Sequence, residues 1–447
     1  MSWLALIFTL LASTACAADP VQEALDRGME AQKAGRTDEA IAALTQCTAL
    51  APKNARCAWE LGWAYWSHGS WKEVVAAWET VQALDPSYPD LAKWLPKAKA
   101  NRDAVASIRA AGASAPATAA PRAADGATVR LRFVGDVMMG ADFPTPELPD
   151  YDGAHLFQQV APLMRDADMT FANLEGPLCD HGETTKCKPE STICYAFRTP
   201  TRYGRYVRDA GVDVASVANN HAGDFGDVCR AETQATLNKL GIAWSGPPGT
   251  IATVMAAGKR VGLIAFHTSG GTNDVNDLPT AAALVQKAKL DHDLVIVSFH
   301  GGAEGADALH VPVGHELFHD EDRGDLREFA RTVIGAGADL VIGHGPHVPR
   351  AMEVLDGHLV AYSLGNFATY GKFNLSGFMG ISLVLEVVLD AKGKLVTGKI
   401  LPTRLIGKGV PEPDPDGTSI DLIRASSETD FPDTAPLIGR DGTIGAR

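Results

Sequence analysis

Residues 294–304 read LVIVSFHGGAE, an apolar run that ends in a polar turn carrying His300 and Glu304. A short apolar run bounded by glycines is typical of a strand buried on both faces. Similar runs recur from residue 130 onward with helical stretches between them, and almost every run ends in a polar cluster. This alternation predicts an α/β layered fold, in which ligands bind at the carboxyl ends of the strands.

The elements of this α/β region, which we expect to span residues 129–409, follow from apolar periods and turn residues. The predicted strands are residues 130–134, 169–172, 214–217, 260–266, 294–298, 340–342, 359–362 and 381–389. Helical patterns fall between them at residues 203–210, 231–239 and 325–336. Residues 410–447 are rich in Pro, Asp and Gly, and we expect an irregular acidic segment there with one short helix at 420–426.

Five of the predicted strands end in side chains that bind metals. Taken singly, such turns are most often structural, but glycines beside them let the backbone approach a bound group. Carboxylate, imidazole and amide ligands without thiolate suit a divalent ion such as Mn, Fe or Zn. Together the five ends predict a metal site, and the residues concerned are Asp136, Asn173, Glu175, Asn219, Asn220, His221, His300, Glu304, His344 and His347.

The order of these turns resembles the calcineurin-like metallophosphoesterases, and it is more closely similar to the CapA-type family. The resemblance rests on the turns above together with the run Tyr362-Ser363-Leu364-Gly365-Asn366-Phe367, and it covers residues 129–405. The CapA-type family is associated with poly-γ-glutamate capsule biosynthesis. The resemblance therefore implies a metallophosphoesterase-like sandwich that binds one or two divalent ions.

The resemblance also implies roles for single residues. His221 would be the general acid, a role suited to an imidazole near its working pH. Glu175 stands where metallophosphoesterases usually have a bridging aspartate, so one metal ion and two both stay open. The implied metal ligands are Asp136, Glu175, Asn220, His300, His344 and His347.

Other residues of these turns would assist catalysis, support the ligands or contact the substrate. Glu304 would take part in catalysis or contact the substrate. Arg350, just past the His pair, would contact an anionic group, and a plain surface position is the alternative. The remaining supporting residues are Asn173, Asn219 and Asn366.

Two functional hypotheses follow from this site. The first is a metal-dependent hydrolase that cleaves a phosphoester or amide-like bond during synthesis of an exported capsule or envelope polymer. The second is a non-catalytic metal-binding scaffold of a polymer assembly or export complex. Both require the metal site, so only a test of turnover separates them.

Residues 1–18, MSWLALIFTLLASTACAA, have the features of an export signal. Their apolar run is too short to span a bilayer and ends in an A-x-A-like site. Lipid modification of Cys16, which would attach the protein to a membrane, is the alternative. Both routes predict an exported protein in the periplasm or cell envelope.

The other cysteines fit an oxidising compartment, where disulfides form. We expect disulfides most strongly among Cys179, Cys187 and Cys194, because that loop is polar and has little core to hold it. For Cys47 and Cys57, a disulfide and simple buried packing both stay open.

Residues 19–110 contain an internal repeat. Gly28 and Gly62 are 34 residues apart, and Pro52 and Pro86 have the same spacing, which resembles tetratricopeptide repeats. The glycine lets the two helices of a hairpin approach, and the proline ends the second helix. Repeats of this kind usually bind protein partners. The Ala/Pro-rich stretch 111–128 predicts a linker to the α/β region.

The composition and net charge limit the kinds of partner that we expect this protein to bind. The formal net charge of -14 argues against nucleic-acid binding, which requires a basic surface. Hydrophobic and charged contents of 46% and 21% are those of a folded soluble protein.

Residues 309–323 place three histidines beside acidic groups. This stretch is either a lid or second source of metal ligands, or a solvated loop.

Overall fold

The computed structural model describes residues 19–33, 36–68, 70–99, 102–103, 128–187 and 195–446. The chain divides into two compact units, one ending at Ala98 and one beginning at Lys99. The predicted export signal with Cys16, nearly all of the predicted linker, and Cys194 lie outside the described residues. Within the described ranges, no helix is long and apolar enough to cross a membrane.

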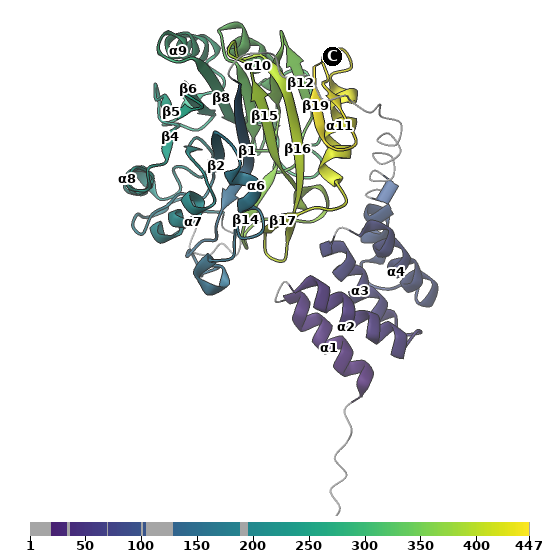
Figure 1. Ribbon diagram of the computed structural model, residues 1–447. Helices are drawn as coiled ribbons and strands as arrows, with labels where there is room; N and C mark the ends of the chain where they lie inside the picture. The colour runs from purple at the N-terminus through teal and green to yellow at the C-terminus, as the bar shows by residue number, and fades with distance from the viewer. Residues whose placement is uncertain are drawn as a thin grey trace, which may run out of the picture. The chain divides into compact units, whose positions relative to one another are not determined.

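The first unit consists of paired helices (Figure 1): α1 (Pro20–Lys33), α2 (Thr37–Leu50), α3 (Ala55–His68) and α4 (Trp71–Leu84). Gly28 lies so close to Leu44 that an added Cβ would be 2.5 Å from that side chain, and a Cβ on Gly62 would be 2.0 Å from Trp78. Each repeat glycine therefore marks the contact between the two helices of its hairpin, which confirms the tetratricopeptide-like prediction.

A disulfide between Cys47 and Cys57 joins α2 to α3. This bond decides between the two alternatives that the sequence left open for these cysteines. It closes a short loop, so the contact between the two hairpins is covalently fixed.

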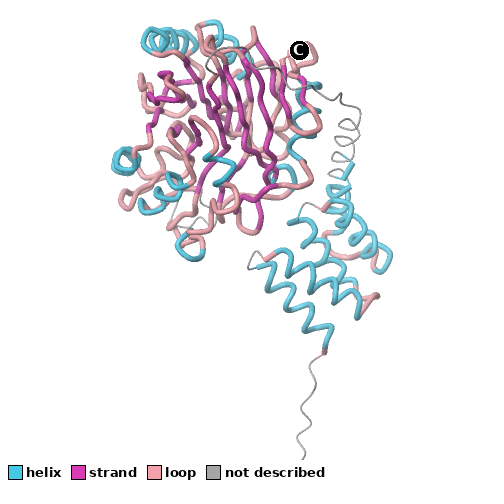
Figure 2. Tube along the Cα trace, viewed as in Figure 1, coloured by secondary structure: helices cyan, strands magenta, loops and turns pink. Residues whose placement is uncertain are grey.

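The second unit is built on two large sheets (Figures 1 and 2). Strands of the first are β1 (Val129–Met138), β2 (Met169–Leu174), β3 (Val214–Ser216), β4 (Ala243–Ser245), β14 (Asn366–Thr369), β15 (Ile381–Leu389), β16 (Leu395–Ile406), β17 (Val410–Pro413), β18 (Leu437–Ile438) and β19 (Thr443–Gly445). Their order is β18-β19-β16-β15-β1-β2-β3-β4, with β14 beside β1 and β17 beside β16.

The second sheet has the order β12-β13-β11-β8-β6-β5, with β7 beside β6. Its strands are β5 (Ala252–Ala256), β6 (Lys259–His267), β7 (Asn273–Asp274), β8 (Leu294–His300), β11 (Leu340–His344), β12 (Met352–Leu355) and β13 (His358–Ala361). A separate hairpin is formed by β9 (Leu317–Phe318) and β10 (Glu321–Asp322).

The two sheets pack face to face, and helices cover their outer faces. Phe133 and Leu385 of the first sheet share one buried cluster with Ile296 and Ile342 of the second. A second cluster joins the first sheet to α6 (Ala161–Arg165), α7 (Gly204–Asp209) and α8 (Gly226–Leu240), and a third joins the second sheet to α9 (Leu278–Asp291) and α10 (Leu326–Gly335). Three 3₁₀ turns complete the unit, η1 (Asp150–Gly153), η2 (Thr201–Tyr203) and η3 (Gly377–Gly380). This four-layer arrangement confirms the predicted α/β layered fold.

The C-terminal residues differ from the prediction in part. The short helix expected at 420–426 is confirmed, within α11 (Thr418–Asp430). The rest of residues 410–447 is not an irregular acidic segment, because β17 and β19 pair with β16. Ile420, Ile423, Ile438 and Ile444 are buried in the cluster between the sheets. Ile438 and Ile444 lie in short strands without a recognisable strand period, so only pairing with distant strands reveals their order. The sequence also missed α9.

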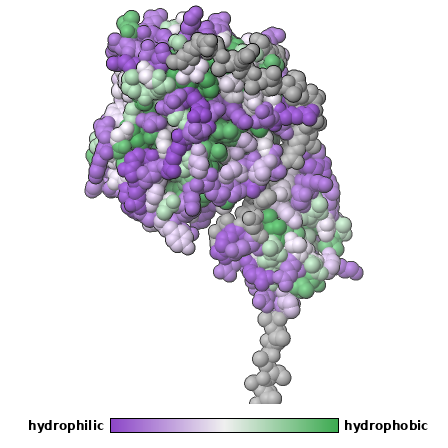
Figure 3. Space-filling view, in the orientation of Figure 1, coloured by the Kyte–Doolittle hydropathy of each residue, from purple (hydrophilic) through white to green (hydrophobic). Residues whose placement is uncertain are grey.

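Figure 3 shows a face that is mainly hydrophilic, with smaller hydrophobic patches between polar side chains. Folded soluble proteins keep such patches because polar groups cannot cover the whole surface.

Candidate metal centre

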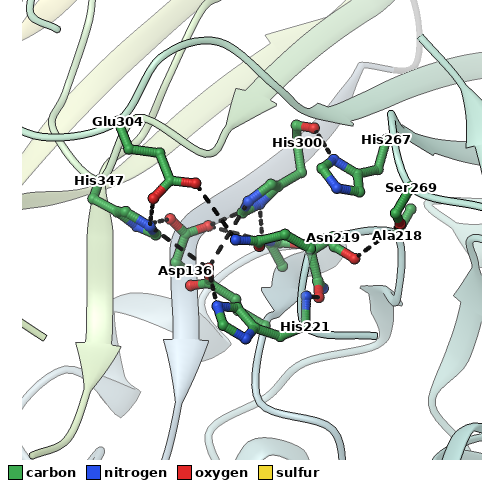
Figure 4. A network of polar contacts seen from close by, with 12 residues as sticks. Asp136, Ala218, Asn219, His221, His267, Ser269, His300, Glu304 and His347 are labelled. Carbon is green, nitrogen blue, oxygen red and sulfur yellow. Dashed lines mark hydrogen bonds and ion pairs between the residues drawn. The ribbon is translucent and has the colours of Figure 1, made fainter. Parts of the chain in front are cut away.

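Polar side chains from both sheets meet at the carboxyl ends of parallel strands (Figure 4). β1, β2 and β3 run parallel in the first sheet, and in the second sheet β8 runs parallel to β11. The Nδ2 of Asn173, on β2, donates to Oδ1 of Asp136 at 2.8 Å and lies 3.1 Å from Nδ1 of His300, on β8. The two sheets therefore contribute to one site.

An irregularity in β1 aims Asp136 into the site. The register of β1 against β2 shifts between Val134 and Asp136, and a Cβ on Gly135 would lie 1.9 Å from the carbonyl oxygen of Gly365. Only glycine fits at that position, and a bulge of this kind redirects the next side chain. Asp136 is fully buried, and its Oδ2 accepts a hydrogen bond from Nδ1 of His347 at 3.0 Å.

Glu175 lies at the centre of the site. Its side chain is fully buried, and neither carboxylate oxygen has a hydrogen-bond partner among the residues that the structure describes. Three imidazole Nε2 atoms surround Oε1, from His347 at 3.7 Å, His300 at 3.8 Å and His221 at 3.9 Å. The Nε2 atom of His300 is also buried without a partner.

These separations fit a bound cation better than direct contacts. They exceed hydrogen-bond length, which ends near ~3.2 Å. Two ligand atoms that share one tetrahedral ion lie about 3.4 Å apart, given ion–ligand distances of about 2.1 Å. One ligand atom each from Asp136, Glu175 and His347 also lies within 4.8 Å of the other two. Because a buried polar atom without a partner is costly, the residues present fit a divalent ion.

Burial and neighbouring charges shift the pKa values of two groups in the site. Burial raises the pKa of the Glu175 carboxyl well above its usual range, and the negative charges of Asp136 and Glu304 act in the same direction. Burial lowers the pKa of His347, but the charge of Glu175, the hydrogen bond to Asp136 and the nearby carboxylate of Glu304 outweigh burial and raise it well above the usual value.

Glu304 lies at the edge of the site, where Oε2 is 3.6 Å from Nε2 of His347. Arg323, a fully buried cation, donates from Nη2 to Oε1 of Glu304 at 2.9 Å. Burial alone would raise the pKa of Glu304, but the positive charge of the neighbouring His347, together with that of Arg323, lowers it to about 2. Glu304 therefore stays ionised beside the three imidazoles.

His221 is held by a neighbour three residues later in the chain. Its Nδ1 lies 2.7 Å from Oδ2 of Asp224, so the ring donates there and Nε2 faces Glu175. The ring stacks on Phe197 with centroids 3.9 Å apart. Burial lowers the pKa of His221, although Asp224 partly offsets this effect. Such a neutral, oriented imidazole is suited to proton transfer.

The asparagines divide into two groups. Asn219 is saturated by local contacts: its amide donates to the carbonyl of Leu174, and its Oδ1 accepts from the backbone N–H of His221. Asn366 donates to the carbonyls of His347 and Met379, so it braces the turn that carries His347. Asn220 lies in the site itself, where its Nδ2 donates to Oε1 of Glu304 at 3.4 Å. Its Oδ1, like those of Asn173 and Asn366, is buried without a hydrogen-bond partner among the described residues, so it can act as a ligand.

Two predicted site residues differ in how they are held. His344 ends β11 opposite His300, and its Nε2 lies 3.2 Å from the carbonyl oxygen of Val134, which leaves its buried Nδ1 without a hydrogen-bond partner among the described residues and available as a ligand. Arg350 is neither at the surface nor free for an anion. It is fully buried, with Nη1 and Nη2 each 2.9 Å from a carboxylate oxygen of Glu316. The pair joins the turn after β11 to the loop before β9.

The loop of residues 309–323 does not bring its histidines to the carboxylates. His310 contacts Asp430 and His315 contacts Asp322, and both rings are exposed, as is His319. Only Arg323, at the end of the stretch, reaches the site.

Three further residues were not singled out by sequence reasoning. Asp224 follows His221 at a spacing of three, a weak signal that turns often produce. His267 ends β6 as His300 ends β8; its Nδ1 bonds to the carbonyl oxygen of His300 (Figure 4), and burial, followed by the charge of Arg323, lowers its pKa to about 3. The position of His267 directly after an apolar run is the sequence signal that could have pointed to it. For Lys186, which contacts Asp224, the sequence offered none.

Comparison with known proteins shows the family of the chain. A family model described as "Bacterial capsule synthesis protein PGA_cap" matches residues 130–370, more than half of the chain. PGA biosynthesis protein CapA of Bacillus subtilis is 29% identical over 255 residues, which are 53% of this chain and 62% of that protein. Capsule biosynthesis protein CapA of Bacillus anthracis is 27% identical over 259 residues, 53% of this chain and 59% of that protein. The chain thus spans about three fifths of these relatives.

A solved structure, the TPR2B domain of yeast Sti1 with an Hsp70 peptide, aligns at 22% identity over 21% of this chain and 78% of its own, with a TM-score of 0.18. That score is too low to carry an argument about function. The family match, in contrast, covers every strand end that contributes to the metal centre.

Proposed function

This chain belongs to the PGA_cap family of bacterial capsule synthesis proteins, and on that premise we propose that it acts in the synthesis of a capsule or envelope polymer. We propose for its α/β unit a metal-dependent hydrolysis of a phosphoester or amide-like bond in a polymer of the poly-γ-glutamate type. The proposed setting is outside the cytosol, in the periplasm or cell envelope, with the helical unit binding a protein partner.

One observation supports this proposal above the others. Glu175 is a fully buried carboxylate without a hydrogen-bond partner, and three imidazole nitrogens face its Oε1 at 3.7–3.9 Å. A protein keeps such an uncompensated group only where it has a use, because burial of an unpaired polar group lowers stability.

The ion would be held by Asp136, Glu175, Asn220, His300, His344 and His347. A bound divalent ion supplies Lewis-acid chemistry, which polarises the bond to be cleaved and promotes ionisation of water. The protein's own contribution is orientation. His221 presents Nε2 toward Glu175, where it can accept a proton from water and pass it on to a leaving group, while Asp224 accepts from Nδ1–H.

Turnover by the purified full chain tests this function. The chain is loaded with Mn²⁺ or Zn²⁺ and assayed on aryl phosphate esters and on poly-γ-glutamate, with metal content measured by elemental analysis. We expect metal-dependent cleavage that is lost in His221→Ala. The exposed His319 provides the matched control, His319→Ala, which should retain wild-type rates.

The alternative function is a non-catalytic metal-binding scaffold, and burial of the site is the observation in its favour. Asp136, Glu175 and His300 have no exposed surface at all. Stoichiometric metal binding without cleavage of either substrate class, together with complementation of a deletion strain by His221→Ala, would establish the scaffold and reject the hydrolase.

A further inference from the structure

A polar arm, residues 179–187, leaves the first sheet four residues after Glu175 and returns to the metal centre through Lys186. Most of its side chains are exposed, and it contains neither a helix nor a strand of the large sheets. Such a segment buries too little apolar surface to order itself. Its position must therefore come from specific links to the rest of the unit.

Several of those links lead to helix α8 and the turn before it, and others lead to residues 198–201. A disulfide joins Cys179 to Cys229 of α8. The backbone N–H groups of Asp180 and His181 donate to Oε2 of Glu232, also on α8, at 2.8 and 3.0 Å. The disulfide from Cys179 to Cys229 corrects the expectation that Cys179 would form a disulfide with Cys187 or Cys194. Cys187, at the other end of the arm, is also disulfide-bonded.

At its far end the arm places the ammonium group of Lys186 beside Asp224, the residue that holds the ring of His221. Nζ of Lys186 donates to Oδ1 of Asp224 at 2.7 Å, while Oδ2 of Asp224 accepts from the backbone N–H of Phe197 at 2.8 Å. Oδ2 also lies 2.7 Å from Nδ1 of His221, a shorter contact than the 3.3 Å between that nitrogen and Lys186. Asp224 therefore has a donor on each side, and the ring is left to donate from Nδ1.

We propose that Lys186 is a positioning residue for His221, acting through Asp224, and that the Cys179–Cys229 disulfide holds Lys186 in place. With the arm docked, the carboxylate of Asp224 has one orientation, so His221 keeps the tautomer protonated on Nδ1 and presents Nε2 to the site. Without the arm, Asp224 is free to turn toward solvent and the ring loses its fixed tautomer. The role of Lys186 in catalysis rests on the proposed hydrolase function. Its effect on the tautomer of His221 does not depend on that function.

The test is the imidazole ¹⁵N spectrum of the full chain, labelled at histidine and loaded with Zn²⁺, with His221 assigned by difference from His221→Ala. We expect one Nδ1–H tautomer in the wild type and in Lys186→Arg, and a mixture of tautomers in Lys186→Met. The double variant Cys179→Ala/Cys229→Ala should give the same mixture. Lys186 is largely exposed, with 41% of its side-chain surface accessible, so its variants are expected to fold.

The chain offers a matched disulfide control in its other unit. Cys47→Ala/Cys57→Ala should leave the His221 signals unchanged, because that bond lies within the helical unit. An unchanged Nδ1–H tautomer in Lys186→Met or in Cys179→Ala/Cys229→Ala, with circular dichroism showing a folded chain, would overturn the proposal.

Turnover provides a second, separable measurement. If the wild type hydrolyses a substrate, Lys186→Met should be slower by about 10–100-fold, as for other residues that orient a catalytic or metal-binding group, and Lys186→Arg should recover most of the rate. If the wild type hydrolyses nothing, the proposed function fails while the tautomer experiment still decides the role of Lys186.

Discussion

Oε1 of Glu175 and Nε2 of His300 lie 3.8 Å apart, both are buried, and neither has a hydrogen-bond partner. Glu175 follows a strand of the first sheet, and His300 ends a strand of the second. The apolar cluster between the sheets thus gives way, at the strand ends, to polar atoms aimed at the same space. The first three predictions follow from this relationship and its neighbours.

Glu175→Gln should abolish high-affinity metal binding yet stabilise the metal-free protein. The amide keeps the shape of the side chain but escapes the cost of burying a carboxylate, and we expect the free energy of unfolding at pH 8 to rise by about 1 kcal/mol. Urea denaturation with a chelator present measures the stability, and titration calorimetry with Zn²⁺ measures the affinity. A variant that binds Zn²⁺ as tightly as the wild type would remove Glu175 from the ligand set.

The stability of the metal-free protein should fall as pH rises from 6 to 9. Glu175 and His347 both have pKa values raised in the folded state, the first by burial and the second by the carboxylates around it. Groups of this kind stabilise the fold below their unfolded pKa values and lose that contribution as pH rises through the folded values. The loss is about 1.4 kcal/mol for each pH unit that separates the unfolded and folded pKa values of a group.

Saturating Zn²⁺ should remove or reverse this pH dependence, because metal binding displaces protons and is favoured at higher pH. Urea denaturation at each pH, with chelator or with metal, makes the comparison. Parallel curves for the two conditions would show that these groups do not hold the ion.

Asp224→Asn should slow turnover by about 10–100-fold, and His221→Ala by about 100–10,000-fold, if the protein is a hydrolase. Asp224 orients the ring, whereas His221 transfers the proton, so the second change removes more. Both variants should keep their metal content by elemental analysis. Equal losses in the two variants would indicate that Asp224 does more than orient His221.

Arg350→Met should destabilise the second unit by about 3–5 kcal/mol, because it leaves Glu316 as a buried charge without a partner. The double variant Arg350→Met/Glu316→Leu should recover most of this loss. The partly exposed pair of Arg404 and Glu412 provides the control, since Arg404→Met is expected to cost no more than about 1 kcal/mol. An Arg350→Met loss as small as the control would refute a structural role for the buried pair.

Much of the fold followed from local patterns. The repeat glycines Gly28 and Gly62 predicted helical hairpins, and apolar runs that end in polar turns predicted the layered α/β unit. The misjudged part was the C-terminal segment, where Ile420 and Ile444 gain their burial from strands and core residues much earlier in the chain. The spacing of residues within the segment does not show that it packs against those distant strands.

The residue types at the strand ends can be read from the sequence alone, because each apolar run and the polar turn after it lie in one short stretch. Which of these side chains contact one another depends on the tertiary structure. Asn173 and His300 are 127 residues apart in the chain, and Asp136 and His347 are 211 apart, so their contacts depend on how the two sheets pack. The same packing turned Arg350 inward to Glu316 and His344 toward a backbone carbonyl, and it brought Lys186 to Asp224. Side-chain direction at such sites is set by long-range burial and electrostatics, which no short stretch of sequence contains.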